Sequence, residues 1–166
     1  MPPLIKDRVV VEDRWTLLRE AKTRDDVPAG VAAIVPLPLW RNERDALLAR
    51  GDVGVWLAPT DDPLALADDV TTLPLIAVDF PKFTDGRGYS IARLLRDRLG
   101  YRGELRAIGD VLRDQLFALS QCGFDAFALR ADRDATEALA SFDDFDSVYT
   151  STTKTREPWF RRRAAS

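Results

Sequence analysis

Apolar and polar positions follow two different patterns along the chain, and the change between them predicts where the main fold begins. From Val31 onward, continuous apolar runs of strand length recur. They cover residues 31–37, 53–58, 73–80, 104–109 and 124–130. Continuous apolar strands are typical of a sheet that is covered on both faces.

Stretches with helical spacing lie between these runs. In the clearest one, residues 91–99, apolar side chains share one side, while Arg93, Arg96 and Asp97 take the other, and Gly100 is the expected C-cap. Similar but weaker patterns cover residues 43–51, 61–69, 112–123 and 133–142. The alternation predicts βαβ units. We expect an α/β fold with a mostly parallel sheet of five or six strands flanked by helices, and a partial (β/α) barrel is the alternative.

The two ends of the chain lack this alternation. Residues 9–18, VVVEDRWTLL, are expected to form an N-terminal β-hairpin that turns at Glu-Asp. The length suits a single domain, residues 1–166. Within it we expect a hairpin and linker over 1–30, an α/β core over 31–150 and an extended C-terminal arm over 151–166.

Two absences limit the chemistry. The chain contains no histidine, which excludes Ser-His-Asp and Cys-His catalysis and histidine-ligated metal sites. Its single cysteine, Cys122, cannot form an internal disulfide or supply four thiolates to a cluster, and is expected to be a buried, inert thiol. No phosphate-binding fingerprint is visible, so we expect neither a metal nor a cofactor.

Charge and hydropathy narrow the class of partner. The net charge is −3, which does not favour nucleic-acid binding. No apolar run approaches the roughly 20 residues that span a bilayer, and the N-terminus has no signal-peptide pattern. We therefore expect a soluble cytoplasmic protein that binds neither nucleic acid nor membrane.

The most concentrated chemistry lies in FPKFTDGRGYS, Phe80 to Ser90, because ligands of parallel α/β folds meet the loops after the strands. Asp85 is expected to cap the following helix. Gly86 and Gly88 suggest a backbone approach that a Cβ would forbid. Lys82 and Arg87 beside this turn predict an anion site. The alternative is a glycine-shaped turn with solvated charges, in which Phe83 and Tyr89 only pack.

The next strand ends in a second such loop. Asp110 is expected to cap the helix that follows it, with Arg113 in the first helical turn. Asp79 is expected to pair with an arginine rather than bind a cation. We expect Lys82, Arg87 and Arg113 to converge on one mouth with Asp79 and Asp110, because parallel strands end at the same edge. The hypothetical anion-binding residues are Lys82, Asp85, Gly86, Arg87, Gly88, Ser90, Asp110 and Arg113.

The C-terminal arm carries an aromatic-basic tip. Trp159, Phe160 and Arg161 are residue types that are enriched at interfaces, so they are candidates for binding a partner protein or a second copy of the chain. A tail without a binding role is the alternative.

The segment from residue 73 to residue 129 resembles a bacterial family of unknown function. The resemblance spans residues 33–140 and is most specific in FPKFTDGRGYS and GELRAIGDVLRDQ. Genes of that family commonly lie beside the gene for assimilatory sulfite reductase, and its members are often labelled probable oxidoreductases of sulfite reduction. The resemblance implies a role in sulfur assimilation without naming a catalytic residue.

Two functions of different kinds follow as expectations. One is an accessory protein of assimilatory sulfite reduction that acts through sulfite reductase or its electron donor. The other is a small α/β enzyme or sensor that binds a sulfur-containing or phosphorylated anion at the Phe80–Ser90 loop, with carboxylates for any acid–base chemistry. A flavin or nicotinamide oxidoreductase would need a phosphate-binding loop that the sequence does not show. Whether the chain is an enzyme stays open at this point.

Overall fold

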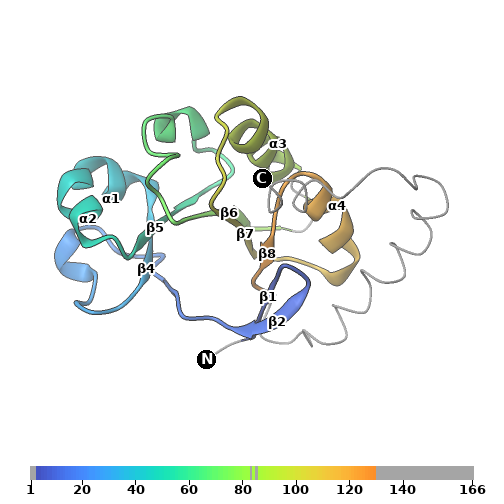
Figure 1. Ribbon diagram of the computed structural model, residues 1–166, viewed down its shortest axis with the longest axis horizontal. Helices are drawn as coiled ribbons and strands as arrows, with labels where there is room; N and C mark the ends of the chain where they lie inside the picture. Colours follow the sequence, from blue (N-terminus) through green and yellow to red (C-terminus); the bar gives the residue numbers. More distant parts are fainter. Residues whose placement is uncertain (1–2, 83, 85, 130–166) are drawn as a thin grey trace.

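The computed structural model describes residues 3–82, 84 and 86–129, in which helices pack on the outer side of a curled, mixed sheet (Figure 1). The eight strands are β1 (Pro3–Lys6), β2 (Val9–Glu12), β3 (Thr16–Leu17), β4 (Ala33–Pro36), β5 (Val53–Leu57), β6 (Leu75–Phe80), β7 (Glu104–Gly109) and β8 (Ala126–Phe127). The α-helices are α1 (Leu37–Asn42), α2 (Arg44–Arg50), α3 (Arg87–Arg93) and α4 (Leu116–Gln121). Short helical turns are η1 (Arg24–Asp26), η2 (Pro63–Leu66), η3 (Leu94–Arg98) and η4 (Arg113–Gln115).

The strand order is β2-β1-β8-β7-β6-β5-β4-β3. Strands β3 to β8 pair in parallel, each with the next in the chain, whereas β1 is antiparallel to both β8 and β2. The prediction of a mostly parallel sheet of five or six strands is therefore wrong, because the hairpin strands β1 and β2 and the short strand β3 extend the five predicted strands to eight, and antiparallel pairing of β1 makes the sheet mixed. The alternative, a partial barrel, fits. The connections between the parallel strands place α1 to α4 in chain order around the outer side (Figure 1).

A short connection shows how strongly the sheet curls. Strands β2 and β3 are the two edges of the sheet, yet only residues 13–15 join them. Four Cα steps reach at most about 14 Å. A flat sheet of eight strands would separate its edges by roughly 34 Å. The sheet therefore bends into a half-barrel with an inner and an outer face.

The outer face is the larger part of the core. Alternate strand residues, among them Val55, Val78 and Ala107, are buried there beneath apolar side chains of the helices. The inner face has its own smaller cluster, made of Ile34, Leu75, Ala77 and Ile108, with Trp15, Leu17, Trp56 and Ala128 packed against it. Burial on both faces explains why the strands read as continuous apolar runs.

A buried ion cluster lies beside the inner apolar cluster. Arg106 in β7 donates to Glu104 Oε2 at 2.8 Å and to Asp13 Oδ1 at 2.9 Å. Glu104 Oε1 also forms a salt bridge with Lys6 Nζ at 2.9 Å. Only 2% of the Arg106 side chain is exposed. Because Asp13 belongs to the connection between the two sheet edges, this cluster ties that connection to the middle of the sheet.

The N-terminal hairpin exists, but one strand earlier than predicted. It joins β1 to β2 through Asp7 and Arg8, whose φ values are 51° and 65°. Left-handed φ at both central residues gives the turn twist that suits a two-residue hairpin. The Glu-Asp pair expected to be the turn instead ends β2, and residues 16–17 pair with β4 at the opposite edge.

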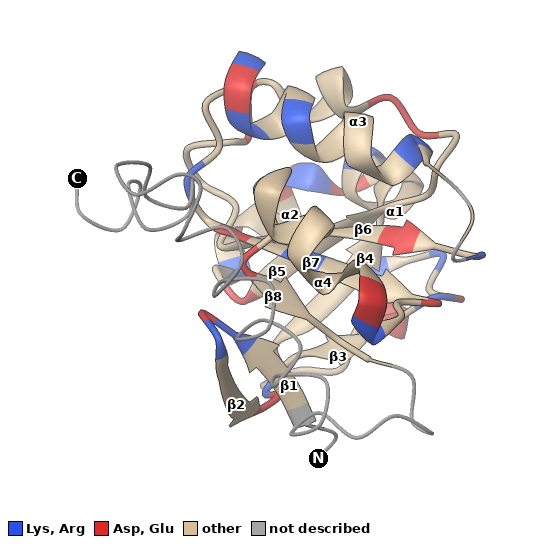
Figure 2. Cartoon of the chain, turned by 90° about the vertical axis from the view of Figure 1, so that its right-hand side faces the viewer, with Lys and Arg blue, Asp and Glu red and all other residues tan. Residues whose placement is uncertain are grey.

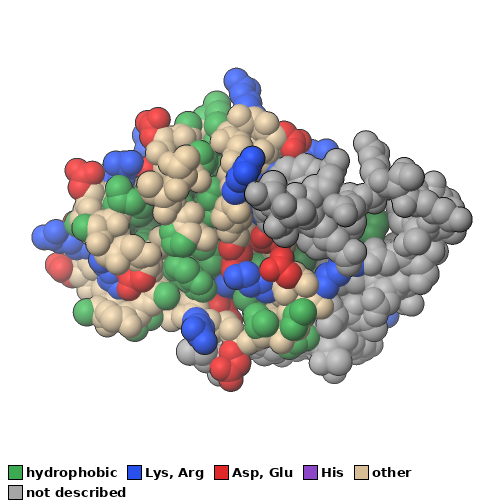
Figure 3. Space-filling view, in the orientation of Figure 1, with side chains coloured by type: hydrophobic (Ala, Val, Ile, Leu, Met, Phe, Trp, Pro, Cys, Tyr) green, Lys and Arg blue, Asp and Glu red, His purple; other side chains and the backbone are tan. Residues whose placement is uncertain are grey.

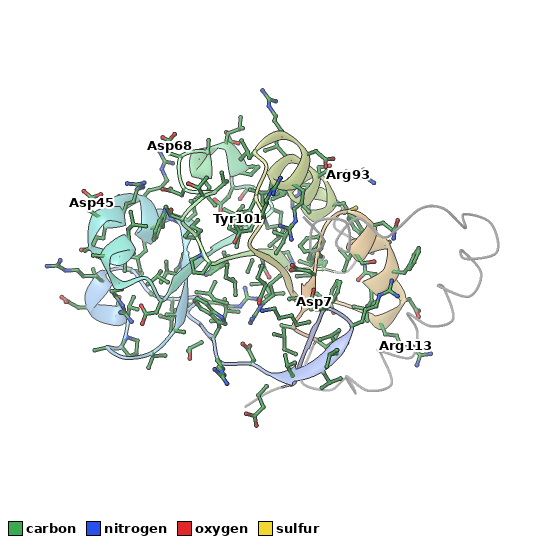
Figure 4. All side chains as sticks on the ribbon, viewed as in Figure 1. Asp7, Asp45, Asp68, Arg93, Tyr101 and Arg113 are labelled. Carbon is green, nitrogen blue, oxygen red and sulfur yellow. The ribbon has the colours of Figure 1, made fainter. Side chains whose placement is uncertain are left out.

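The predicted helix over 91–99 starts earlier and changes its winding. It begins at Arg87 as α3 and continues as a π-helical turn, η3, with Leu99 N–H bonding the Leu94 carbonyl. The wider turn carries Arg96 inward, against the prediction that it faces solvent. Arg96 donates to the carbonyls of Gly123, Tyr101 and Gly103 at 2.8 to 2.9 Å. Tyr101, central in Figure 4, lies beneath this guanidinium.

None of the helices in the described residues is long and apolar enough to cross a membrane. The predicted helix over 133–142 and the C-terminal arm lie outside those residues.

Candidate functional site

The carboxyl ends of β6 and β7 bring the two polar loops of the sequence together. Phe80 pairs with Gly109 in register, and the Asp110 N–H donates to the Phe80 carbonyl at 2.6 Å. Asp79 is the penultimate residue of β6, the strand labelled near the middle of the sheet in Figure 2. The expectation that Asp79 and Asp110 lie at one edge is confirmed.

Asp79 is paired with an arginine, as expected, and the structure identifies it as Arg19. Arg19 Nη2 donates to Asp79 Oδ1 at 3.0 Å. The same guanidinium lies 5.4 Å from the ring centroid of Trp56, whose Nε1 donates to the Leu18 carbonyl at 3.1 Å. A buried carboxylate and an indole face thus hold Arg19 from two sides. Arg19 follows β3, Trp56 lies in β5 and Asp79 in β6, so the curl of the sheet assembles this group.

Position 109, at the carboxyl end of β7, requires glycine. Its φ is +91°, and a Cβ there would lie 2.5 Å from both Asp79 Oδ1 and the Phe80 carbonyl oxygen. Only glycine combines this conformation with so close an approach. The strand end is therefore shaped around the Asp79 carboxylate.

The Phe80–Ser90 residues have different roles. Gly88 is buried, and a Cβ there would collide with the ring of Phe80, so Gly88 is a packing residue between α3 and β6. Tyr89 packs edge-on against the same ring, with centroids 5.8 Å apart, as predicted for a packing residue. Two predictions for this turn are wrong: the N-cap of α3 is Gly86 rather than Asp85, and Gly86 makes no close approach, since open space lies where its Cβ would be. Lys82, Arg87 and Ser90 are exposed, whereas Phe83 and Asp85 lie outside the described residues.

The second loop departs from prediction at Asp110. Asp110 does not cap the following helix, because η4 begins only at Arg113 and has Leu112 as its N-cap. Arg113 is half-exposed and lies 3.8 Å from the Asp114 carboxylate; Figure 4 labels it at the outer end of this segment. Convergence of Lys82, Arg87 and Arg113 on one mouth stays a prediction.

A second group of buried charges lies at the other end of the strands, where β7 and β8 begin. Asp125 accepts the Leu105 N–H at 2.8 Å and faces Arg96 at 3.4 Å. Burial raises the pKa of Asp125 to about 7. Buried titratable groups often mark active sites. Here the pair lies at the amino ends of β7 and β8, which in closed (β/α) barrels is the end associated with stability, and hydrogen bonds join both partners to backbone groups.

The described part of the chain contains no group of three or more His, Cys, Asp or Glu side chains that could hold a metal ion. Cys122 is a buried free thiol, and burial raises its pKa, which disfavours the reactive thiolate. The described arrangement is suited to recognising charged groups through Arg19 and the exposed residues of the edge. The candidate docking residues Trp159, Phe160 and Arg161 lie outside the described residues.

Comparison with known protein families identifies the family of this chain. A family model described as a bacterial protein of unknown function (DUF934) matches residues 54–160, more than half of the chain. The chain belongs to this family. No curated protein and no solved structure matches it. The match begins in β5 and includes β6, β7 and both loops of the edge, while Arg19 lies before it.

Sequence reasoning missed Arg19 and Trp56 as members of the site. Trp56 stood within an apolar run, and Arg19 stood in a polar stretch after a strand that was assigned to the wrong pairing. A signal was present in Asp79 itself. A carboxylate that ends a fully apolar strand needs a cation, and the candidates were the arginines that follow other strands.

Proposed function

We propose that this DUF934 protein is an accessory protein of assimilatory sulfite reduction that acts through a protein partner, either sulfite reductase or its electron donor. One observation carries the proposal. The two sequence blocks that bear the resemblance, FPKFTDGRGYS and GELRAIGDVLRDQ, follow or contain β6 and β7, which pair over their full length and end together at one edge. A surface built from both blocks is the natural place for a function they share.

The composition supports a role through a partner. Sulfite reduction is redox chemistry, and a chain without histidine and with one buried cysteine has few ligands for a redox metal. A partner would supply the redox group, and this chain would supply the exposed charges of the edge. The exposed side chains of Lys82 and Arg87 would contribute positive charge toward an acidic surface of the partner.

The test measures binding of the purified chain to sulfite reductase and, separately, to its electron donor. The unsubstituted chain is expected to bind one of them, and the double variant Lys82→Glu, Arg87→Glu to bind at least about tenfold more weakly, since reversing rim charges replaces attraction by repulsion. Both side chains are exposed, so the fold should persist, which circular dichroism checks. The matched control is Arg14→Glu, at an exposed position in the connection before β3.

Failure of the unsubstituted chain to bind either protein would refute the proposal. Equal binding by the double variant would place the docking surface elsewhere. A chain ending at Arg156 then tests the predicted role of Trp159 and Phe160: loss of binding or of self-association on truncation supports that role, and unchanged behaviour removes it.

The second candidate function is binding of a small inorganic anion at the Phe80–Ser90 loop. The observation in its favour is that Arg87 is exposed and begins α3 directly after the loop that follows β6. Titration with sulfite, sulfate and phosphate is expected to show saturable binding that falls about tenfold in Arg87→Ala, because a charge-assisted contact is lost. Equal, weak binding by both chains would contradict an anion site at this loop.

A further inference from the structure

A pocket of about 350 Å³ opens at the same sheet edge as Asp79, between the segment that follows β3 and helix α1. Its lining combines two cations and an amide with an apolar floor. The residues that matter are Arg19, Lys22, Pro36, Pro38, Leu39 and Asn42. Its volume is at the lower end of the range for small-molecule sites. Neither the Phe80–Ser90 loop nor the family match includes it.

Arg19 is held ready to bind a ligand in this pocket. Its guanidinium has five N–H donors, and one of them is used at 3.0 Å by Asp79. The contact with Trp56 fixes the plane of the group, while 41% of the side chain remains exposed. A planar guanidinium that is fixed and still has donors to offer matches the two oxygens of a carboxylate. Such preorganisation lowers the entropy lost on binding.

The charges around the pocket favour a ligand with one negative charge. Arg19 and Lys22 line it together with Glu20, and Asp79 behind Arg19 offsets part of the positive charge. A phosphate dianion would meet too little positive charge. On the face shown in Figure 3, basic and acidic side chains are likewise interspersed, without a continuous basic field among the residues drawn in colour.

The apolar floor selects the rest of the ligand. Pro36, Pro38 and the buried Leu39 offer ring and methyl carbons, with the Asn42 amide at the rim. A short hydrocarbon body would lose water on entering, which stabilises binding in proportion to the area it buries.

We propose that this pocket binds a small organic monoanion, a carboxylate with a short apolar body, through a bidentate contact with Arg19. Lys22 adds a second, solvent-exposed charge, and Trp56 reports occupancy because its ring lies against Arg19. The proposal is independent of any role in sulfite reduction, since it uses different residues and needs no partner protein.

The test follows the Arg19 Nε–H and Trp56 indole N–H signals of the ¹⁵N-labelled full chain by NMR during titration with butyrate, acetate and inorganic phosphate. Butyrate is expected to shift both signals saturably and to bind up to about tenfold more tightly than acetate, because of its two further methylene groups. Phosphate is expected to bind more weakly than butyrate. Arg19→Lys is expected to weaken butyrate binding about tenfold, because an ammonium cannot make the bidentate contact.

Two further variants keep the result clear. Lys22→Met keeps the side-chain length at an exposed position, leaves the Arg19–Asp79 pair in place and is expected to weaken butyrate binding a few-fold. Arg14→Lys, outside the pocket, is expected to bind like the unsubstituted chain. No saturable shift with any of the three anions, or equal butyrate affinity in the unsubstituted chain and both Arg19→Lys and Lys22→Met, overturns the proposal. Tighter binding of phosphate than of butyrate overturns the assignment to a carboxylate.

Discussion

Replacing Arg106 with alanine is expected to lower the free energy of unfolding by about 3–5 kcal/mol, the cost of removing one partner from a buried ion pair. The guanidinium uses Nε and Nη2 on Glu104 and Nη1 on Asp13, and 2% of the side chain is exposed. Without it, two largely buried carboxylates face each other with Lys6 as the remaining nearby cation. Urea denaturation followed by circular dichroism measures the loss.

The matched control is Arg14→Ala, which removes an exposed arginine next to Asp13 and should leave stability nearly unchanged. The triple variant Arg106→Met, Glu104→Gln, Asp13→Asn should be more stable than Arg106→Ala, because it removes the stranded charges together with their partner. If Arg106→Ala and Arg14→Ala unfold at the same urea concentration, the cluster does not hold the curled sheet together.

Replacing Gly109 with alanine is expected to destabilise the protein by about 3 kcal/mol, from left-handed strain of roughly 1–2 kcal/mol and from overpacking. The new Cβ would lie 2.5 Å from Asp79 Oδ1 and from the Phe80 carbonyl oxygen, and the latter belongs to the backbone and cannot move aside cheaply. Displacement of Asp79 should also release Arg19, so the indole N–H signal of Trp56 should shift.

Gly51→Ala is the control for this variant. Gly51 also has a left-handed φ, +76°, but nothing lies within 4 Å of the place where a Cβ would be. It should therefore lose only the conformational part, about 1 kcal/mol. Equal losses in the two variants would show that the approach of Gly109 to Asp79 does not matter for stability, and an unchanged Trp56 signal would separate Gly109 from the Arg19 site.

Local pattern was sufficient for the elements whose two faces are both buried. The predicted runs 53–58, 73–80 and 104–109 became β5, β6 and β7 with ends shifted by at most two residues. A strand buried on both sides is apolar throughout, and its neighbours in the chain carry that information. Gly100, expected to end the helix over 91–99, also behaved as predicted, because a helix end depends on short-range spacing: its φ is positive, 69°.

Local pattern failed where the deciding contact is distant or the turn lacks a typical residue. The turn at Asp7–Arg8 contains no glycine or asparagine, so the hairpin was assigned one strand too late. Arg96 was assigned to the surface from its helical phase, because a π-helical turn leaves no clear mark in the sequence. Its partners are carbonyls of Tyr101, Gly103 and Gly123, which converge only in the fold.

For the candidate site too, sequence reasoning predicted some features and missed others. The sequence predicted that the loops after β6 and β7 lie together, since parallel strands end at the same edge, and that Asp79 pairs with an arginine. It could not identify that arginine, because Arg19 is 60 residues away and reaches Asp79 only through the curl of the sheet. Gly88 was grouped with the ligand-binding residues, whereas its neighbour, the Phe80 ring, shows that packing requires it.

The sequence by itself determined the central strands β5, β6 and β7, the edge at which Asp79 and Asp110 lie, and the limits set by lacking histidine and having one cysteine, because these depend on residue type and short spacing. Only the tertiary structure decided the order of eight strands, the half-barrel and the pairs Arg19–Asp79 and Arg106–Asp13. The physical reason is the distance along the chain over which each effect acts. Hydrophobic spacing acts over a few residues, whereas a buried charge is stabilised by whichever partner the closing sheet brings within about 3 Å.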